Sequence, residues 1–279
     1  MDNQNKTIFI TGASSGIGRD ITYTLAKLGY KVFAGVRRKV DKQELESLNP
    51  NITGVYIDVT NSASIEKAFW FVMKNADKVD VLINNAGIVC AGPVACIPIS
   101  KIKEQFDVNT FGPIMVTQRF IPLLHGSKVI NISSMAASGI FPYISMYCAS
   151  KRALDIIFSS FFLENKDNIK VISVKPSSIK TPIWRKSAIK AKETLADFSD
   201  VNKQKYEEVM LALEKNAINN SIYGIEPRKV TDIVIKIIKS KHPKISYDVG
   251  VQAHVASAFS KLPQCVINAI VKLKLRNLM

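Results

Sequence analysis

Short runs of apolar and β-branched residues recur along the chain, separated by longer stretches in which apolar residues repeat with helical spacing. Uninterrupted apolar runs bounded by turn residues are typical of strands that are buried on both faces. The predicted strands are residues 7–10, 31–36, 53–58, 80–84, 128–132, 169–175 and 244–249. The predicted helices are residues 17–28, 41–48, 62–74, 99–124, 147–163, 227–239 and 262–276. This alternation predicts an α/β protein with a doubly wound parallel sheet of about seven strands and helices on both faces.

The alternation is interrupted once, between the sixth predicted strand and the helix predicted at residues 227–239. A connection this long, from residue 181 to residue 226, usually carries a function. Residues 203–215 have helical spacing, so we expect a partly helical substrate lid near residues 182–226. Its apolar side chains suit an apolar substrate and equally suit ordinary packing or a subunit contact. Because the chain has no linker or internal repeat, residues 1–279 are expected to form one domain.

The predicted C-terminal tail, near residues 255–279, is amphipathic and cationic. Gln264, Asn268, Lys272 and Arg276 recur every four residues, so they share one helix face opposite the apolar residues. One interpretation is peripheral contact with an anionic membrane surface. The other is that the apolar face packs on the domain, the lid or a partner subunit.

Composition and charge exclude several classes of protein. The 279 residues carry a net charge of +15, most of it in residues 166–279. A basic chain attracts polyanions, but no zinc-finger, RRM or basic-zipper pattern is present, so no nucleic-acid partner is expected. No apolar run reaches the roughly 18 residues that span a bilayer, and residues 1–6 are polar rather than signal-like. We expect a cytoplasmic protein that is peripheral to a membrane at most.

The cysteines and histidines do not have the spacing of metal ligands. Cys90, Cys96, Cys148 and Cys265 form no CxxC pair, and the three histidines are scattered. We therefore expect no metal site, and we expect the four thiols to be reduced core residues.

A glycine-rich turn follows the first predicted strand and opens the first predicted helix. In this context Gly12 allows the tight turn, Gly16 lets the backbone approach a pyrophosphate, and Gly18 lets helix and strand pack closely. The helix N-terminus offers free amides and the positive end of a dipole to phosphates. The residues of the predicted dinucleotide site in this turn are Gly12, Ser14, Ser15, Gly16, Ile17 and Gly18.

The end of the second predicted strand discriminates between nicotinamide cofactors. An acidic residue there would bind the ribose 2′-hydroxyl of NAD, but this chain has Arg37. A guanidinium pairs with a 2′-phosphate, so we predict a preference for NADP(H), with NAD(H) as the alternative. Arg37 is otherwise a solvated loop charge. Asp58 either accepts a hydrogen bond from the adenine amino group or starts a turn.

Tyr147 and Lys151 stand four residues apart at the start of a predicted helix, which places the phenol and the ammonium on one face. A free phenol has a pKa of about 10, and a nearby cation lowers that pKa by stabilising the phenolate. Ser134 lies thirteen residues before Tyr147, just past a strand end where ligands bind in such sheets. Its hydroxyl is suited to polarise a substrate carbonyl, whereas the adjacent Ser133 is interpreted as a turn residue.

With these residues assembled, the chain resembles the short-chain dehydrogenase/reductase family, a group of Rossmann-type enzymes, in its branch of typical length. Within the family it looks most like the hydroxysteroid and retinol dehydrogenases and their bacterial relatives, whose substrates are apolar alcohols, ketones or retinoids. The matches cover roughly residues 6–182 and are the glycine-rich turn, Asp58-Val59-Thr60, Asn84-Asn85-Ala86-Gly87, residues 107–112, Ser134, Tyr147 to Lys151, and Lys175-Pro176 through Thr181.

The resemblance implies a catalytic tetrad of Asn109, Ser134, Tyr147 and Lys151. Tyr147 would act as the general acid or base, and Ser134 would orient the carbonyl. Lys151 would bind the nicotinamide ribose and lower the pKa of Tyr147, and Asn109 would hold a water in the proton relay. Homodimers or homotetramers are also implied.

The resemblance further implies which residues bind the cofactor. Thr181 would contact the nicotinamide carboxamide, and residues 84–87 would support the sheet and line the adenosine site. The family usually has Pro-Gly where this chain has Pro176-Ser177, so a less permissive backbone is expected there. Beyond the glycine-rich turn, the expected cofactor-binding residues are Arg37, Asp58, Val59, Asn85, Ala86, Gly87, Tyr147, Lys151, Pro176 and Thr181.

The sequence thus predicts an oxidoreductase that transfers a hydride between NADP(H) and a small apolar carbonyl or alcohol that is steroid-, retinoid- or lipid-like. The alternative is a non-catalytic relative of the same fold that binds NADP(H) as a sensor or scaffold. Loss of Tyr147 or Lys151 would favour that alternative, and both residues are present.

Overall fold

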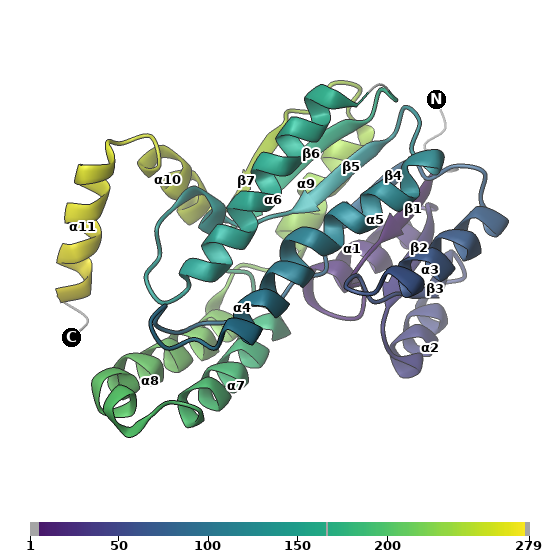
Figure 1. The fold of residues 1–279 in the computed structure, drawn as a ribbon. Helices are drawn as coiled ribbons and strands as arrows, with labels where there is room; N and C mark the ends of the chain where they lie inside the picture. Colours follow the sequence, from purple (N-terminus) through teal and green to yellow (C-terminus); the bar gives the residue numbers. More distant parts are fainter. Residues whose placement is uncertain (1–5, 166, 277–279) are drawn as a thin grey trace.

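Seven strands form a parallel sheet in the order β3-β2-β1-β4-β5-β6-β7. The structure is a computed structural model that describes residues 6–165 and 167–276 (Figure 1). The polar chain start and the last three residues of the predicted tail lie outside the described residues. The strands are β1 (Thr7–Ile10), β2 (Lys31–Val36), β3 (Ile52–Tyr56), β4 (Val81–Asn84), β5 (Lys128–Ile132), β6 (Lys170–Pro176) and β7 (Ser246–Val249). The predicted parallel α/β sheet of about seven strands is confirmed.

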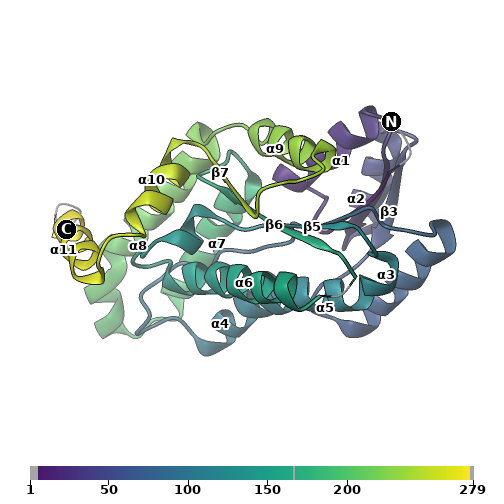
Figure 2. The same ribbon diagram turned by 90° about the horizontal axis from the view of Figure 1, so that it is seen from above.

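Helices cover both faces of this sheet. Helices α1 and α9 lie on one face, and α3, α5 and α6 lie on the other (Figure 2). Successive strand residues point to opposite faces, so Ile8 and Ile10 enter one core while Phe9 enters the other. This explains the uninterrupted apolar runs in the sequence. The main helices are α1 (Gly16–Lys27), α2 (Lys39–Leu48), α3 (Ser62–Asn75), α4 (Ile99–Phe106), α5 (Gly112–Phe120), α6 (Ser145–Glu164) and α9 (Arg228–Lys239).

The order of the strands switches between β1 and β4, with β2 and β3 on one side and β5 to β7 on the other. β1 pairs with β2 on one side and with β4 on the other. In open parallel sheets, ligands bind outside the carboxyl ends of the strands at this switch point. The loops that follow β1 and β4 are the glycine-rich turn and residues 85–87, so the fold places both loops where a ligand is expected.

One predicted helix, residues 99–124, differs from the structure in an informative way. A π-helical turn, η2 (Asp107–Phe111), separates α4 from α5, and a 3₁₀ turn, η3 (Ile121–Leu123), ends the stretch. π-Turns inside helices are frequent at functional sites. Here the turn carries Asn109, which is fully buried.

The segment predicted to be partly helical is a pair of helices, α7 (Pro182–Ala196) and α8 (Asp200–Tyr223). Its two ends are joined, because Lys180 N donates to Ile225 O at 2.9 Å and Ile225 N donates to Ser178 O at 3.0 Å. We call α7 and α8 the helical hairpin. Its apolar side chains Leu195, Phe198, Tyr206, Met210 and Leu213 pack together in a small cluster with Ala191 and Cys96. Ordinary packing therefore accounts for these five, whatever else the hairpin does.

The C-terminal region contains two helices rather than one. α10 (Val251–Phe259) was not predicted, and α11 (Gln264–Arg276) matches the predicted tail helix. In both views the two helices extend away from the sheet (Figures 1 and 2). Ile267 is buried, whereas Val266 and Leu273 are exposed. Cys265 is also exposed, so the expectation that every cysteine is a core residue was wrong. Among the described residues, no helix has the length and apolar content that crossing a bilayer requires.

Candidate active site

The predicted site residues converge on one edge of the sheet, because the carboxyl ends of parallel strands meet there. The glycine-rich turn follows β1, Arg37 follows β2, and Asp58 follows β3. Asn85 follows β4, and Ser134 follows β5. Thr181 lies just beyond β6, directly before α7.

Each glycine of the turn is in close contact with another part of the site. A Cβ atom on Gly12, which has φ of +66°, would lie 2.8 Å from Ala86 Cα. A Cβ on Gly18 would lie 2.3 Å from the Gly12 carbonyl oxygen. A Cβ on Gly16 would lie 3.0 Å from the Thr181 side chain. The close helix–strand packing predicted for Gly18 is therefore present, and Gly16 also brings α1 against the start of α7.

Thr11 and Asn85 fix the shape of the turn. Asn85 Nδ2 donates to the carbonyl oxygens of Thr11 and Gly12, both at 2.9 Å. Thr11 Oγ1 accepts from the backbone amides of Asn85 at 3.1 Å and Ala86 at 3.2 Å. Thr11 was missing from the predicted site residues, although its position directly before Gly12 was the available signal. These bonds hold the loops after β1 and β4 together across the switch point.

The first turn of α1 is suited to an anion. Its N-cap residue, Ser15, makes no side-chain hydrogen bond to the helix amides, and the turn contains no acidic residue. The free N-terminal amides and the helix dipole favour a phosphate at such a position. Together with the glycine cradle, this arrangement fits the pyrophosphate of a dinucleotide.

The two arginines after β2 differ in their partners. Arg38 Nε donates to Asp41 Oδ2 at 2.8 Å, whereas Arg37 is exposed. The hydrogen bond from Arg38 lowers the pKa of Asp41; burial opposes this shift, and the charges of Arg38, Lys186 and Arg37 reinforce it. Arg38 is thus neutralised by Asp41, and Arg37 is the guanidinium that remains for a ligand at this strand end.

Asp58 forms the turn that the sequence offered as one interpretation. Its Oδ1 accepts from Thr60 N at 2.9 Å and from Thr60 Oγ1 at 2.7 Å. Burial alone would raise the pKa of Asp58, but these hydrogen bonds and the charge of Arg37 lower it. The neighbouring Val59 packs its side chain in the core, which leaves only its backbone for a ligand.

Asn109 and Lys151 are adjacent in the buried part of the site. A Cβ on Gly87 would lie 3.4 Å from Asn109 Oδ1 and 3.5 Å from Lys151 Nζ. Asn109 Oδ1 accepts from Ile88 N at 2.9 Å, while Nδ2 donates to Ile88 O at 2.9 Å and to Ser150 Oγ at 3.1 Å. The Asn109 amide thus joins the loop after β4 to α6.

Tyr147 and Lys151 both reach the end of β5. Lys151 Nζ donates to Ile132 O at 2.9 Å, and the Ser134 side chain is near enough to the Tyr147 hydroxyl to lower its pKa. Ser134 Oγ also accepts from Ala136 N at 3.1 Å, at the start of η4 (Met135–Ser138). The structure therefore brings all four predicted catalytic residues together.

The pKa values of this pair are governed by burial. Burial raises the pKa of Tyr147 to about 12, and the Ser134 side chain opposes that shift. Burial also lowers the pKa of Lys151 to about 8, and the charge of Asp155 opposes it. The sequence led us to expect that Lys151 lowers the pKa of Tyr147. In the chain by itself burial outweighs any such lowering, because desolvation disfavours the charged form of each group and the ammonium is bonded to Ile132.

Pro176 is buried at the end of β6, where it pairs in register with Val249. Thr181 Oγ1 donates to Ile179 O at 3.4 Å, which places its side chain between Gly16 and the base of the helical hairpin. Ser177 N donates to Val249 O at 2.9 Å. No group of three or more His, Cys, Asp or Glu side chains suited to a metal ion occurs among the described residues.

Comparison with known proteins supports the same class. The family model for short chain dehydrogenase matches residues 6–192. The chain is 31% identical to an NADPH-dependent 3-dehydrocapnine reductase of Ornithobacterium rhinotracheale, over 86% of this chain and 87% of the relative. It is 35% identical to mouse estradiol 17-beta-dehydrogenase 2, over 72% of this chain and 56% of the relative. A short chain dehydrogenase from Burkholderia cenocepacia, solved in complex with NADP, has the same fold with a TM-score of 0.75 and 23% identity, over 97% of this chain and 99% of that chain.

Proposed function

The chain belongs to the short-chain dehydrogenase/reductase family, and we propose that it is an NADP(H)-preferring enzyme acting on an apolar carbonyl or alcohol. The observation that carries the proposal is the meeting of Tyr147, Lys151, Ser134 and Asn109 at the edge of the sheet that also holds the glycine cradle. A sensor or scaffold needs the cradle but gains nothing from this proton-transfer group. We therefore favour the catalytic interpretation over the non-catalytic alternative.

A nicotinamide cofactor supplies the hydride when it is bound. The phosphates would be held by the first-turn amides of α1, and Lys151 would bind the nicotinamide ribose. Tyr147 transfers the proton: it donates to the substrate oxygen during reduction and accepts the alcohol proton during oxidation. Because burial raises the pKa of Tyr147 to about 12, the phenol is protonated at neutral pH, which is the form that reduction requires.

The proposed role of Ser134 is to orient the substrate. Its Oγ accepts from Ala136 N at 3.1 Å, which leaves the hydroxyl hydrogen for Tyr147 or for a substrate carbonyl. In this arrangement the carbonyl oxygen lies between two hydroxyl groups, and both stabilise the negative charge that develops on it.

The preference for NADP(H) rests on Arg37. Arg38 is occupied by Asp41, and the exposed Arg37 guanidinium is suited to a 2′-phosphate by charge and by geometry. A relative with 31% identity is described as NADPH-dependent, which supports this preference. NAD(H) stays the alternative.

The substrate class and the partners are further parts of the proposal. The helical hairpin begins directly after Thr181, so we propose that it is the substrate lid of a single domain. A relative named for estradiol supports an apolar substrate. We also propose a homodimer or homotetramer in the cytoplasm, while peripheral membrane contact through α11 stays a prediction that the exposed Val266 and Leu273 suit.

The test is consumption of NADPH and of NADH, at matched concentrations, with a panel of steroid, retinoid and long-chain carbonyl substrates. We expect faster consumption of NADPH and inactivity of the Tyr147→Phe variant. If Tyr147→Phe turns over as fast as the wild type, the assignment of Tyr147 is wrong. If NADPH binds and no carbonyl in a broad panel is reduced, the sensor interpretation replaces the catalytic one.

A further inference from the structure

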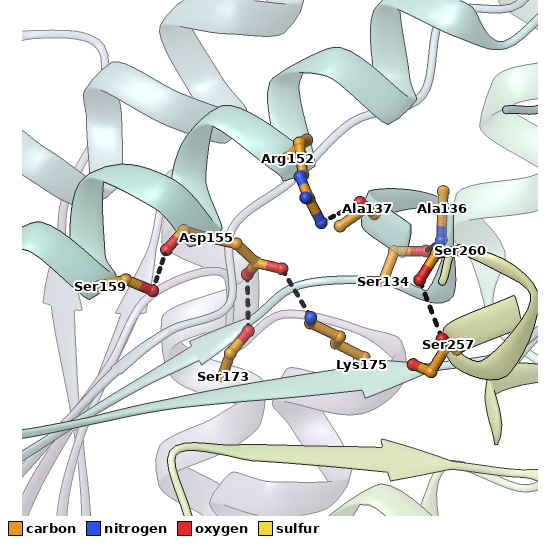
Figure 3. A network of polar contacts seen from close by, with 10 residues as sticks. All are labelled: Ser134, Ala136, Ala137, Arg152, Asp155, Ser159, Ser173, Lys175, Ser257 and Ser260. Atoms are coloured by element: carbon orange, nitrogen blue, oxygen red, sulfur yellow. Dashed lines mark hydrogen bonds and ion pairs between the residues drawn. The ribbon is translucent and has the colours of Figure 1, made fainter. Parts of the chain in front are cut away.

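A buried ion pair lies behind the candidate active site, between α6 and β6 (Figure 3). Asp155 Oδ2 is 3.2 Å from Lys175 Nζ, and the two side chains are only 10% and 15% exposed. Ser173 Oγ donates to Asp155 Oδ1 at 2.6 Å. The carboxylate therefore has a charged partner on one oxygen and a hydroxyl partner on the other.

The position of this pair relates it to Tyr147 and Lys151. Tyr147, Lys151 and Asp155 follow one another at intervals of four residues on α6, so they share a face of the helix. Lys151 bonds to the carbonyl of Ile132 on β5, and Asp155 bonds to Ser173 on the adjacent strand β6. Asp155 thus continues the row of reactive side chains by one helical turn into the protein.

Stability is a weak reason for an ion pair in this place. Removing two charges from water costs free energy that their attraction often only just offsets, and apolar residues of similar volume commonly do as well. A buried pair beside a proton-transfer group is better explained by its electrostatic effect on that group.

The groups around Lys151 show which charge acts on its ammonium group. On α6, Tyr147 and Asp155 lie one turn to either side of it; from β6, Lys175 faces Asp155. The loop after β4 and the π-turn present the Gly87 backbone and the Asn109 amide. Among the described residues, Asp155 is the charge that raises the pKa of Lys151 against the effect of burial.

We propose that Asp155 is a positioning residue, oriented by Lys175 and Ser173, which keeps Lys151 in the ammonium form that proton transfer at Tyr147 requires. The inference rests on the proposed function of Tyr147 and Lys151. Lys175 has two effects: it holds the carboxylate in place, and its own positive charge offsets part of the field that Asp155 exerts on Lys151.

This division of roles predicts opposite effects for two substitutions. Asp155→Asn keeps the shape and the bond with Ser173 but removes the negative charge, so Lys151 loses its proton at lower pH. Lys175→Met removes the offsetting cation, so Lys151 keeps its proton to higher pH. For two charges on the order of 6 Å apart at an effective dielectric constant of about 20, Coulomb's law gives about 2.8 kcal/mol, or about two pH units. We take this as the upper limit of the downward shift in Asp155→Asn, and we expect a smaller upward shift in Lys175→Met.

The experiment measures Lys151 directly. The full-length protein is labelled with [ε-¹³C]lysine, and the Lys151 signal is identified as the one that is lost in Lys151→Met. Its chemical shift is then followed from pH 6 to pH 11 in the wild type, Asp155→Asn and Lys175→Met. Asp232→Asn, which removes an exposed carboxylate paired with Arg228, is the matched control and is expected to leave the Lys151 titration unchanged.

Shifts of opposite sign in the two variants support the proposal. Unchanged midpoints, or midpoints that move in the same direction, overturn it, because a purely structural role would disturb both variants alike. If Asp155→Asn fails to fold, Lys175→Met alone decides by the direction of its shift. Asp155→Glu is expected to restore the wild-type midpoint, since a cavity of about 20 Å³ beside Asp155 takes up part of the added methylene.

Turnover is measured separately, as the pH profile of kcat/KM with NADPH and the best substrate of the panel. We expect its alkaline limb to move with the Lys151 midpoint in each variant. If the ¹³C midpoints move and no substrate is reduced, the proposed function fails while the electrostatic coupling stands. If substrates are reduced and the limb stays fixed while the ¹³C midpoints move, Lys151 is not needed as an ammonium and the positioning role is refuted.

Discussion

Substitution of Gly18 by alanine tests the packing that shapes the nucleotide turn. A Cβ at this position would lie 2.3 Å from the Gly12 carbonyl oxygen and 2.4 Å from Asn85 Nδ2. These two atoms form a hydrogen bond of 2.9 Å that holds the turn against the loop after β4. The added methyl group must therefore separate α1 from the turn by roughly 1 Å or break that bond, as expected for overpacking in a close-packed region.

The magnitude follows from three contributions. Overpacking costs about 1–3 kcal/mol, and loss of the hydrogen bond costs about 0.5–1.5 kcal/mol. Alanine returns about 1 kcal/mol through its higher helix propensity. We expect a loss of about 1–3 kcal/mol in the free energy of unfolding, a fall in Tm of about 2–5 °C, and at least a tenfold loss in NADPH affinity, which is about 1.4 kcal/mol.

Thermal unfolding and NADPH fluorescence titration measure the two effects. The matched control is Gly126→Ala, because Gly126 has φ of +65° and nothing within 4 Å of the added Cβ. The control is expected to lose about 1–2 kcal/mol to backbone strain alone and to keep wild-type NADPH affinity. Wild-type NADPH affinity in Gly18→Ala would refute the claim that the turn is shaped by this contact.

Three further predictions concern the other groups. Tyr147→Phe is expected to lower kcat by about 10²–10⁴-fold, measured at saturating NADPH so that any change in cofactor affinity does not contribute; a smaller loss would assign proton transfer elsewhere. Arg37→Gln should weaken NADPH binding about 10–150-fold and leave NADH binding unchanged. The control Lys27→Gln, which removes an exposed charge elsewhere, should change neither affinity. Equal losses for both cofactors in Arg37→Gln would contradict a 2′-phosphate contact. Burial lowers the pKa of Lys128 to about 8; the charges of Lys6 and Lys170 reinforce this shift, and the charge of Asp80 opposes it. Between about pH 8 and 10 the unfolded chain therefore binds more protons at Lys128 than the folded chain does. The contribution of Lys128 to stability rises with pH over this range. The measurement is the free energy of urea unfolding at about pH 8 and pH 10, which should rise less with pH in Lys128→Met than in the wild type. The same rise in both proteins would exclude a lowered pKa of Lys128.

Most of the fold was predictable because burial on both faces of the sheet leaves a clear pattern. The predicted bounds of β1, β2 and β5 match the structure. The helical hairpin was only partly predicted, since α8 buries just Met210 and Ala217 and so shows no regular apolar face. Helix α10 was not predicted for the same reason, because Ala253 is its only buried residue.

The positions of the site residues were predictable because each follows a strand end and all strands are parallel. Their electrostatics were not, because a spacing of four residues in the sequence does not reveal how deeply the pair is buried. Lys151 is 4% exposed, and this desolvation governs its pKa. Asp155 gave no signal on its own, since its partners Ser173 and Lys175 come from a different element.

The serine of the Pro176-Ser177 departure lies beside a glycine from another part of the chain, Gly250. Positive φ among the described non-glycine residues is confined to Tyr143 and Asn168, so Ser177 needs no glycine-like conformation and carries no backbone strain. The special conformation is at Gly250 instead, with φ of +93° and ψ of 152°, a region that is essentially restricted to glycine.

The two positions are coupled, because a Cβ on Gly250 would lie 2.5 Å from Ser177 Oγ. Gly250→Ala is therefore expected to lose about 1–3 kcal/mol of unfolding free energy through backbone strain, plus the cost of this contact. Adding Ser177→Gly removes the contact and leaves the strain, so a double-mutant cycle in urea should recover about 0.5–1 kcal/mol. Strict additivity would show that the serine at position 177 does not depend on the glycine at position 250.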